Sequence, residues 1–301
     1  MSAVAMPAPA RQRRRWITLT VGAVLVGLVV AVALVSLFWT PYLPSDTTGG
    51  RLESPTLSHL LGTDKLGRDL LTRLMIGARI ALAVGVGAVA LGGLLGVTAG
   101  VVAGFATRWL DDTIAALLDI LIAFPTLLLA MLVVAARGAS LSSAIVAIGL
   151  AMSAIVARLS RILVKRVLAQ DFITAARTSG TSWTRIVFEH VLPNIWSTLV
   201  VNLALQFGLA VLAEASLSYL GLGPPPPNAS WGRMLQEAQS TVLTAPAGAI
   251  APGVLLVLLV VGVNLVADGL REAADGLGSV RSAASRRGGR SLAEPSSRLS
   301  R

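Results

Sequence analysis

The sequence predicts an all-α membrane protein with six transmembrane helices, and its composition and the spacing of its apolar segments lead to that class. Of the 301 residues, 54% are hydrophobic and only 13% are charged. A typical soluble domain has about 45–50% apolar and about 25% charged residues. Long apolar segments with few charges recur along the chain. These features exclude an ordinary soluble enzyme and also a disordered chain, because disorder requires low hydrophobicity.

The first apolar segment runs from Trp16 to Trp39 and contains no charge. It is long enough to cross a bilayer and too long for the apolar core of a signal peptide, which has about 7–15 residues. We therefore expect a retained span with a tryptophan at each membrane interface. The six predicted spans cover residues 16–39, 79–104, 113–136, 141–158, 194–220 and 249–270.

The distribution of Lys and Arg predicts the orientation of these spans. If the N-terminus is inside, 18 of the 25 basic residues lie in inner segments and 7 in outer ones. Cytoplasmic loops carry the excess of basic residues, so both termini are expected in the cytoplasm. The net charge of +10 then serves orientation and contact with anionic lipid, and nucleic acid is not an expected partner.

The chain divides into three predicted regions. Residues 1–15 form a cytoplasmic N-terminal tail. Residues 16–277 form the membrane domain, which includes a long inner loop at 159–193. Residues 278–301 are rich in Ser, Arg and Gly, and we expect a disordered cytoplasmic tail there.

Residue types suited to catalysis or metal binding are scarce. The chain has no cysteine and only two histidines, His59 and His190, which are too few for a histidine-based zinc site. Neither an H-E-x-x-H nor a G-x-S-x-G motif is present. We expect no catalytic residue, no metal and no cofactor, and an intramembrane hydrolase is the least favoured alternative.

Four glycines, Gly92, Gly96, Gly100 and Gly104, recur at every fourth position of the second span. Small residues at this spacing let two membrane helices approach closely, so helix packing is the favoured interpretation. A surface on which helices slide during transport is the functional alternative.

Three residues inside the spans are candidates for the transport pathway or a subunit interface: Asp119, Pro125 and Glu214. Carboxylates within a membrane are costly and often functional. For Asp119, a structural partner near the cytoplasmic interface is the favoured alternative. Pro125 should kink its helix. Glu214 has no basic residue in its own span, so we expect its partner on another helix or chain.

The inner loop after the fourth span predicts two short helices. Gly180 can end the first, Ser182 can cap the second, and Pro193 suits the first turn of the fifth span. Apolar residues among the charges make this loop either a docking element or an amphipathic segment lying on lipid; they are Phe172, Ile173, Ile186 and Val187.

The same loop resembles the EAA motif of ABC importer permeases, Glu-Ala-Ala-x3-Gly-x9-Ile-x-Leu-Pro. Ala175-Ala176, Gly180 and Leu192-Pro193 reproduce its spacing. Thr174 stands in place of the glutamate and His190 in place of the isoleucine. Because threonine carries no charge, the resemblance does not imply a salt bridge from position 174 to an ATPase.

Three further stretches are similar to the C-type permeases of dipeptide, oligopeptide and nickel importers. They are the G-T-D-x-x-G-R-D sequence at 62–69, residues 214–223, and the N-L-x-x-D-x-L-R sequence at 264–271. This resemblance covers residues 15–276 and implies the type I, MetI-like permease fold.

The resemblance also implies a subunit of a bacterial cell-membrane importer for peptides or related small solutes such as nickel complexes. Its partners would be a homologous second permease, two ABC ATPases and an extracytoplasmic solute-binding protein. The residues implied to couple to the ATPases are Asp171, Phe172, Thr174, Ala175, Ala176, Arg177, Gly180, Leu192 and Pro193. The chain has no G-x-x-x-x-G-K-[ST] motif, so ATP hydrolysis is assigned to the partners. The alternative is an ion-driven secondary transporter that works without ATPases.

Overall fold

The computed structural model describes residues 8–291, with side chains for 16–272, and this part of the chain is almost entirely helical. Within it, the β structure is limited to an isolated bridge between Thr63 and Asp69. The helices are α1 (Ala8–Phe38), α2 (Leu70–Phe105), α3 (Arg108–Ala123), α4 (Thr126–Arg137), α5 (Leu141–Leu168), α6 (Asp171–Thr178), α7 (Trp183–Ile186), the π-helix η1 (Val187–Val191), α8 (Leu192–Tyr219), α9 (Trp231–Ala238) and α10 (Ala247–Ser291).

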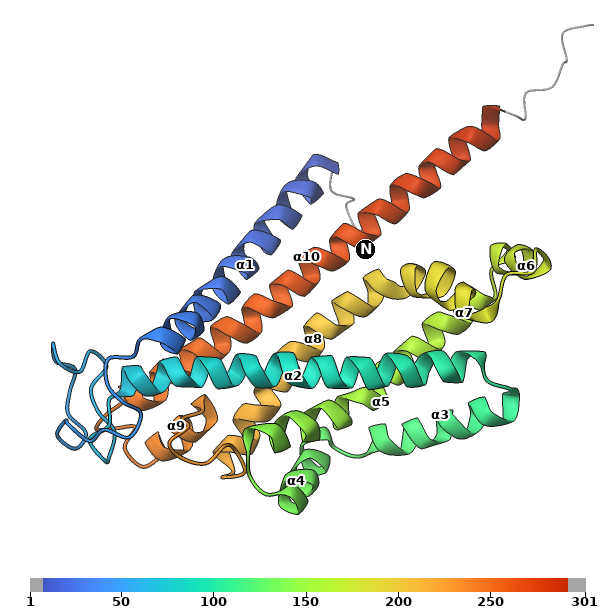
Figure 1. Ribbon diagram of the computed structural model, residues 1–301. Helices are drawn as coiled ribbons and strands as arrows, with labels where there is room; N and C mark the ends of the chain where they lie inside the picture. Colours follow the sequence, from blue (N-terminus) through green and yellow to red (C-terminus); the bar gives the residue numbers. More distant parts are fainter. Residues whose placement is uncertain (1–7, 292–301) are drawn as a thin grey trace, which may run out of the picture.

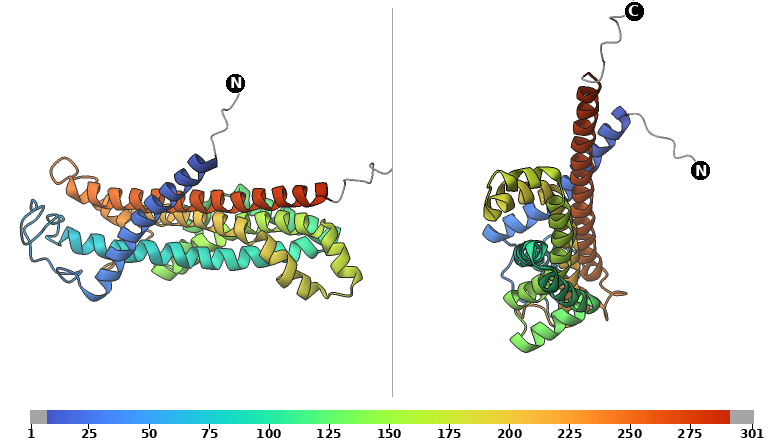
Figure 2. Two further views of the ribbon diagram at one scale, coloured as in Figure 1. Left: turned by 90° about the horizontal axis from the view of Figure 1, so that it is seen from above. Right: turned by 90° about the vertical axis from the view of Figure 1, so that its right-hand side faces the viewer.

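The long helices form an elongated bundle with two different ends (Figure 1, Figure 2). The start of α1, the later part of α10, and α6 point toward one end, which we call the α6 end. Residues 39–69 and α9 lie at the opposite end, which we call the α9 end. This arrangement agrees with the expectation that both termini lie on the same side of the membrane.

The predicted all-helical membrane fold is confirmed, but its third span is not a single helix. Five of the described helices are long and apolar enough to cross a membrane, and α3 and α4 form a pair bent by 88°. Phe124 has an extended backbone and Pro125 follows it. Proline lacks an N–H and disfavours the helical conformation of the preceding residue, so the predicted helix over 113–136 breaks there.

Two other spans are longer than predicted. Helix α2 begins at Leu70 rather than at 79, because Asp69 caps it by accepting a hydrogen bond of 2.7 Å from the Thr72 backbone N–H. Charged residues in its first turns hid this start. Helix α5 continues to Leu168 rather than ending at 158, and so supplies the first part of the predicted inner loop.

The C-terminal segment also differs from expectation. Helix α10 continues through residues 278–291, where we expected disorder. The glycines and serines of this segment are weak helix formers, but its alanines and arginines are strong ones, and the first proline after Pro252 is Pro295, so no proline ends the helix. Residues 1–7 and 292–301 lie outside the described part, and the division into two tails and a membrane domain stays a prediction.

Candidate functional site

Helix α6 is attached to the bundle through a single buried side chain. Ile173 is buried in a cluster with residues of α5, α7 and α8, including Val164, Ile186 and Ile195. Residues on the other sides of α6, including Asp171, Thr174 and Ala175, are exposed. The helix therefore projects from the α6 end with most of its surface available to a partner (Figure 1).

The loop chemistry predicted around α6 is confirmed in detail. Gly180 has φ +81°, and the N–H groups of Gly180 and Thr181 donate to the carbonyls of Arg177 and Ala176. This is a Schellman motif, which requires a left-handed residue after the helix. The Ser182 hydroxyl then accepts a hydrogen bond from the Arg185 N–H at 3.4 Å and caps α7.

Aromatic side chains hold the returning segment against α6. The Arg177 guanidinium lies 4.2 Å from the centre of the Trp183 ring, and Trp183 packs edge-on against Phe105 of α2. The Phe172 and His190 rings lie 6.1 Å apart. Arg177 thus has a structural contact within this chain in addition to any contact with a partner.

The predicted docking residues divide into two groups. Phe172 is 45% exposed, whereas Ile173 and Ile186 are buried in the chain's own core, so the expectation that both isoleucines belong to a docking surface was wrong. Helical periodicity explains the difference, since residues on the inward face must pack against α5 and α8. Among the remaining motif residues, Ala176 and Leu192 are half-buried and Pro193 is exposed in the first turn of α8.

At the α9 end, residues 62–69 form a tight turn, and the structure accounts for its two glycines and two aspartates. Gly62 and Gly67 have φ values of +78° and +81°, which glycine adopts readily. The Asp64 carboxylate accepts hydrogen bonds from the backbone N–H groups of Leu66 at 2.8 Å and Arg68 at 3.0 Å. Asp69 caps α2. The sequence of residues 62–69 therefore determines how the chain turns into α2.

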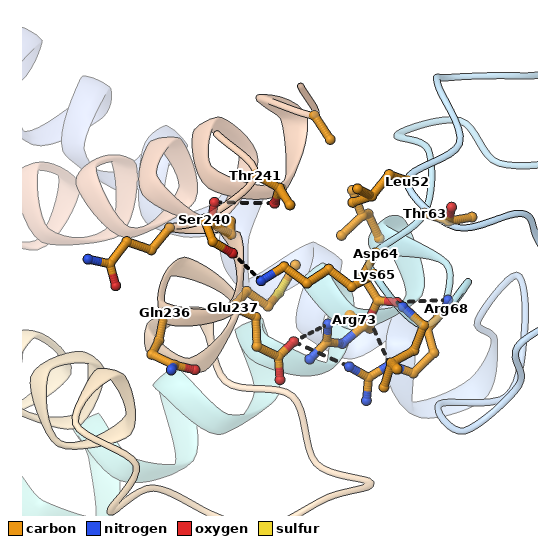
Figure 3. A pocket seen from close by; sticks show the side chains of 17 residues that line it. Leu52, Thr63, Asp64, Lys65, Arg68, Arg73, Gln236, Glu237, Ser240 and Thr241 are labelled. Atoms are coloured by element: carbon orange, nitrogen blue, oxygen red, sulfur yellow. Dashed lines mark hydrogen bonds and ion pairs between the residues drawn. The ribbon is translucent and has the colours of Figure 1, made fainter. Parts of the chain in front are cut away.

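Four charged side chains join this turn to α9 (Figure 3), and we call them the outer clamp: Asp64, Arg68, Arg73 and Glu237. The buried Arg73 guanidinium lies 2.7 Å from both the Asp64 and the Glu237 carboxylates. Arg68 reaches the same two carboxylates, at 2.7 and 3.2 Å. The clamp borders a cavity of about 450 Å³, which is also lined by Lys65, Gln236 and Ser240.

The electrostatics of the clamp favour the ionised form of Glu237. Partial burial raises the pKa of its carboxyl, but the hydrogen bond from Arg73 and the charges of Arg73 and Arg68 outweigh burial and lower the pKa overall. The carboxylate therefore remains charged in the folded protein at neutral pH.

Helix α9 is anchored on the bundle by Trp231. Its side chain is 1% exposed, and the indole N–H donates a hydrogen bond of 3.0 Å to the Leu74 carbonyl of α2. The ring lies directly over Gly77, where a Cβ atom would collide with it. This contact, together with the outer clamp, fixes α9 against the start of α2.

The four glycines of the second span lie in the interface between α2 and α5. A Cβ atom at Gly92 would lie 2.7 Å from the Gly149 carbonyl oxygen, and one at Gly96 would lie 2.6 Å from the Val156 Cβ. Gly100 and Gly104 are equally crowded by Ser160 and Val164. This geometry favours the packing interpretation, because no side chain fits between the two backbones.

The three candidates inside the spans lie in different surroundings. The Asp119 and Arg158 side chains form an ion pair of 3.3 Å. Glu214 is 1% exposed and accepts hydrogen bonds from Ser218 of its own helix, at 2.6 Å, and from Ser230 at the start of α9, so the expected partner on another segment is present together with one on its own helix. Pro125 is exposed at the break between α3 and α4. Whether any of them serves transport stays a prediction.

Sequence reasoning missed a second ion-pair cluster at the α6 end. The buried Asp111 carboxylate of α3 pairs with Arg161, at 2.5 and 2.9 Å, and with Lys165, both of α5. The four-residue spacing of the two cations places them on one helix face, and this was the available signal. The carboxylate that they share is far away in the sequence.

Comparison with known proteins identifies the family. The model of the family described as "Binding-protein-dependent transport system inner membrane component" matches residues 96–276. The dipeptide transport system permease protein DppC of Alkalihalophilus pseudofirmus is 38% identical over 257 residues, which is 83% of this chain and 84% of that protein.

Two further relatives extend the similarity over most of the chain. The glutathione transport system permease protein GsiD of Pectobacterium atrosepticum is 41% identical over 262 residues, 84% of this chain and 86% of that protein. A putative peptide transport system permease of Brucella suis is 38% identical over 278 residues, 91% of this chain and 92% of that protein. With the helical membrane fold, these similarities show that the chain belongs to the family of inner-membrane permease components of binding-protein-dependent transport systems.

Proposed function

We propose that this chain forms half of the translocation pathway of a peptide importer and couples to cytoplasmic ATPases through α6. The relatives named above for dipeptide, glutathione and peptide transport support this substrate class. The resemblance to the EAA motif supports the coupling role. A homologous second permease, two ATPases and a solute-binding protein complete the assembly.

The observation that carries the proposal is the attachment of α6. Ile173 is the one fully buried side chain of the helix, and aromatic contacts of Phe172 and Arg177 supplement it, while Asp171, Phe172 and Ala175 remain exposed. A helix that is mostly exposed gains little stability from its own chain, so its defined position at the tip of α5 suits a contact with another subunit. Motion of that subunit would then pass to α5 and α8 as a rigid-body displacement.

The proposal is tested by purifying the tagged chain from native membranes in mild detergent and identifying the co-purifying proteins by mass spectrometry. Ala175→Arg places a large charged side chain on the exposed face of α6. Ala139→Arg makes the same change at an exposed position between α4 and α5, away from α6, and serves as the matched control.

The unmodified chain and the Ala139→Arg control should bring down a second permease and two ATPases. Ala175→Arg should retain the permease and lose the ATPases. Recovery of the chain alone, or only with copies of itself, would contradict the proposal and favour an ion-driven transporter. Retention of the ATPases by Ala175→Arg would contradict the role of α6.

A further inference from the structure

Helix α3 is divided lengthwise into three faces, which follow its helical periodicity. The face packed against α5 contains Asp111, Ile114, Leu118 and Ile122. An exposed apolar face contains Leu117, Ile120, Leu121 and Phe124. The third face is exposed and carries two carboxylates and two alanines, namely Asp112, Ala116, Asp119 and Ala123, which we call the polar stripe. Of the two exposed faces, the polar stripe is the one less suited to lipid contact, because ionised carboxylates are costly within a membrane.

An ion pair joins the polar stripe to α5. The Arg158 Nη1 lies 3.3 Å from the Asp119 Oδ1, and the two side chains are 54% and 59% exposed. A carboxylate can accept about four hydrogen bonds and a guanidinium can donate five. One contact therefore leaves most of the hydrogen-bonding capacity of both groups open toward the surface of the chain.

The position of Trp109 indicates how deep this pair lies in the membrane. Trp109 is 78% exposed at the start of α3, and exposed tryptophans in membrane proteins concentrate at the interface with water. Asp119 follows ten residues later, ~15 Å along the helix axis at about 1.5 Å per residue. The hydrocarbon core is ~30 Å thick, so Asp119 lies within the core, in the half whose edge Trp109 marks.

Asp111, on the same seam between α3 and α5, provides an internal comparison. It lies close to Trp109 at the interface, yet it is buried and paired with both Arg161 and Lys165. The deeper Asp119 is more exposed and has fewer partners. This order is the reverse of what lipid contact would favour, because ionised groups are most costly at the bilayer centre.

We propose that the polar stripe lines a water-filled path and that Asp119 and Arg158 bind the charged termini of a peptide in transit. This inference rests on the proposed function. Asp119 would accept hydrogen bonds from the terminal ammonium, and Arg158 would hold the terminal carboxylate in a bidentate pair. Since each residue already neutralises the other, the site is weak enough to release its ligand, as a transport pathway requires.

Because the chain contains no cysteine, single cysteine variants can measure water access without a background. The complete importer carrying Ala116→Cys or Ala123→Cys is treated with a membrane-impermeant, positively charged methanethiosulfonate. Leu117→Cys and Leu121→Cys on the apolar face are the matched controls. The stripe cysteines should react at least about tenfold faster, since only a hydrated thiol forms the reactive thiolate.

The same assay tests recognition of the peptide termini. Dialanine should slow the labelling of Ala123→Cys, whereas uncharged N-acetyl-dialanine amide should not. Adding Asp119→Asn to Ala123→Cys should reduce the protecting effect of dialanine about tenfold, which corresponds to the loss of one charge-assisted hydrogen bond. Equal protection by both peptides, or no protection, would overturn the assignment.

Two further outcomes would also overturn it. Labelling no faster than at the control positions would mean that the stripe faces lipid, and labelling of the isolated chain but not of the importer would mean that it contacts the second permease. Failure of the proposed function itself is distinguishable, because no ATPase or second permease would then be recovered with the chain.

Discussion

The two ends of the molecule hold their outermost short helices, α9 and α6, in different ways. At the α9 end, the outer clamp and the Trp231 anchor bury charged and aromatic groups between segments that are distant in the sequence. At the α6 end, the buried ion pairs of Asp111 lie within the bundle, whereas α6 itself is held by Ile173 and by aromatic contacts, and the nearby ion pair between Arg185 and Glu189 is exposed. The difference indicates that α9 is fixed by contacts within this chain, whereas the segment around α6 has exposed surface that a partner can cover.

The comparison also shows where similar side chains have different energetic roles. A buried ion pair that loses one partner leaves an uncompensated charge, which is strongly destabilising. An exposed pair of the same residue types contributes little, because water replaces the lost partner. The substitutions below are therefore expected to change stability at the α9 end and assembly at the α6 end.

The largest effect is expected from Arg73→Ala. Removing this guanidinium leaves Asp64 with only Arg68, and Glu237 with Arg68 and Arg233, and we expect a loss of roughly 3–5 kcal/mol in unfolding free energy. The measurement is the midpoint of thermal unfolding of the purified chain in detergent. Arg185→Ala is the control at the other end, and equal shifts of the two midpoints would refute the contrast between the ends.

Gly180→Ala should have an intermediate and local effect. A left-handed conformation costs a residue with a Cβ atom about 1–2 kcal/mol, and Gly180 has φ +81° with open space around its Cα. Recovery of ATPases should fall while the thermal midpoint of the chain stays nearly unchanged. Gly180→Asn is the matched variant, and it should retain more ATPase because asparagine adopts this conformation more readily.

Acid should weaken the α9 end through Glu237, by a smaller amount. Its folded-state pKa lies below the ordinary value of 4.5, so its stabilising contribution is complete above that pH. This contribution is lost as the pH falls through the lowered folded-state pKa. Unfolding midpoints measured from pH 7 to pH 3 should fall more for the unmodified chain than for Glu237→Gln. Parallel curves would show that the clamp does not depend on this ionisation.

The smallest effect is expected at the exposed pair of the α6 end. Glu189→Gln removes the contact of 2.8 Å with Arg185, and an exposed pair at this helical spacing contributes about 0.2–0.5 kcal/mol. The change in the unfolding midpoint should vanish in high salt, because exposed charges are screened. A salt-resistant loss would show that this pair is more enclosed than its exposure indicates.

Much of the candidate site follows from local rules and was predictable. Gly180 and Ser182 act through the backbone conformation and hydrogen bonds of their own turns, so their roles could be inferred from the loop sequence. The glycine repeat from Gly92 to Gly104 defines one helix face by spacing alone. What it packs against, α5, was not predictable, because the partner face has a different sequence pattern.

Features that depend on distant contacts escaped prediction. Arg73 argues against a membrane helix when considered alone, and only its ion pairs with Asp64 and Glu237 explain why α2 begins before it. Similarly, Pro125 predicted a kink, but the 88° bend between α3 and α4 depends on how both helices pack against α5. Asp111 was overlooked because its cations belong to another helix.

The sequence by itself determined the membrane class, the approximate spans, the charge asymmetry that orients them and the turn chemistry around α6. These properties depend on the hydropathy of single segments and on hydrogen bonds over a few residues. Only the tertiary structure decided which charges are buried, which are exposed, and which meet across helices. Burial and ion pairing depend on the positions of neighbouring helices, so Asp111 and Asp119, eight residues apart on one helix, have opposite environments.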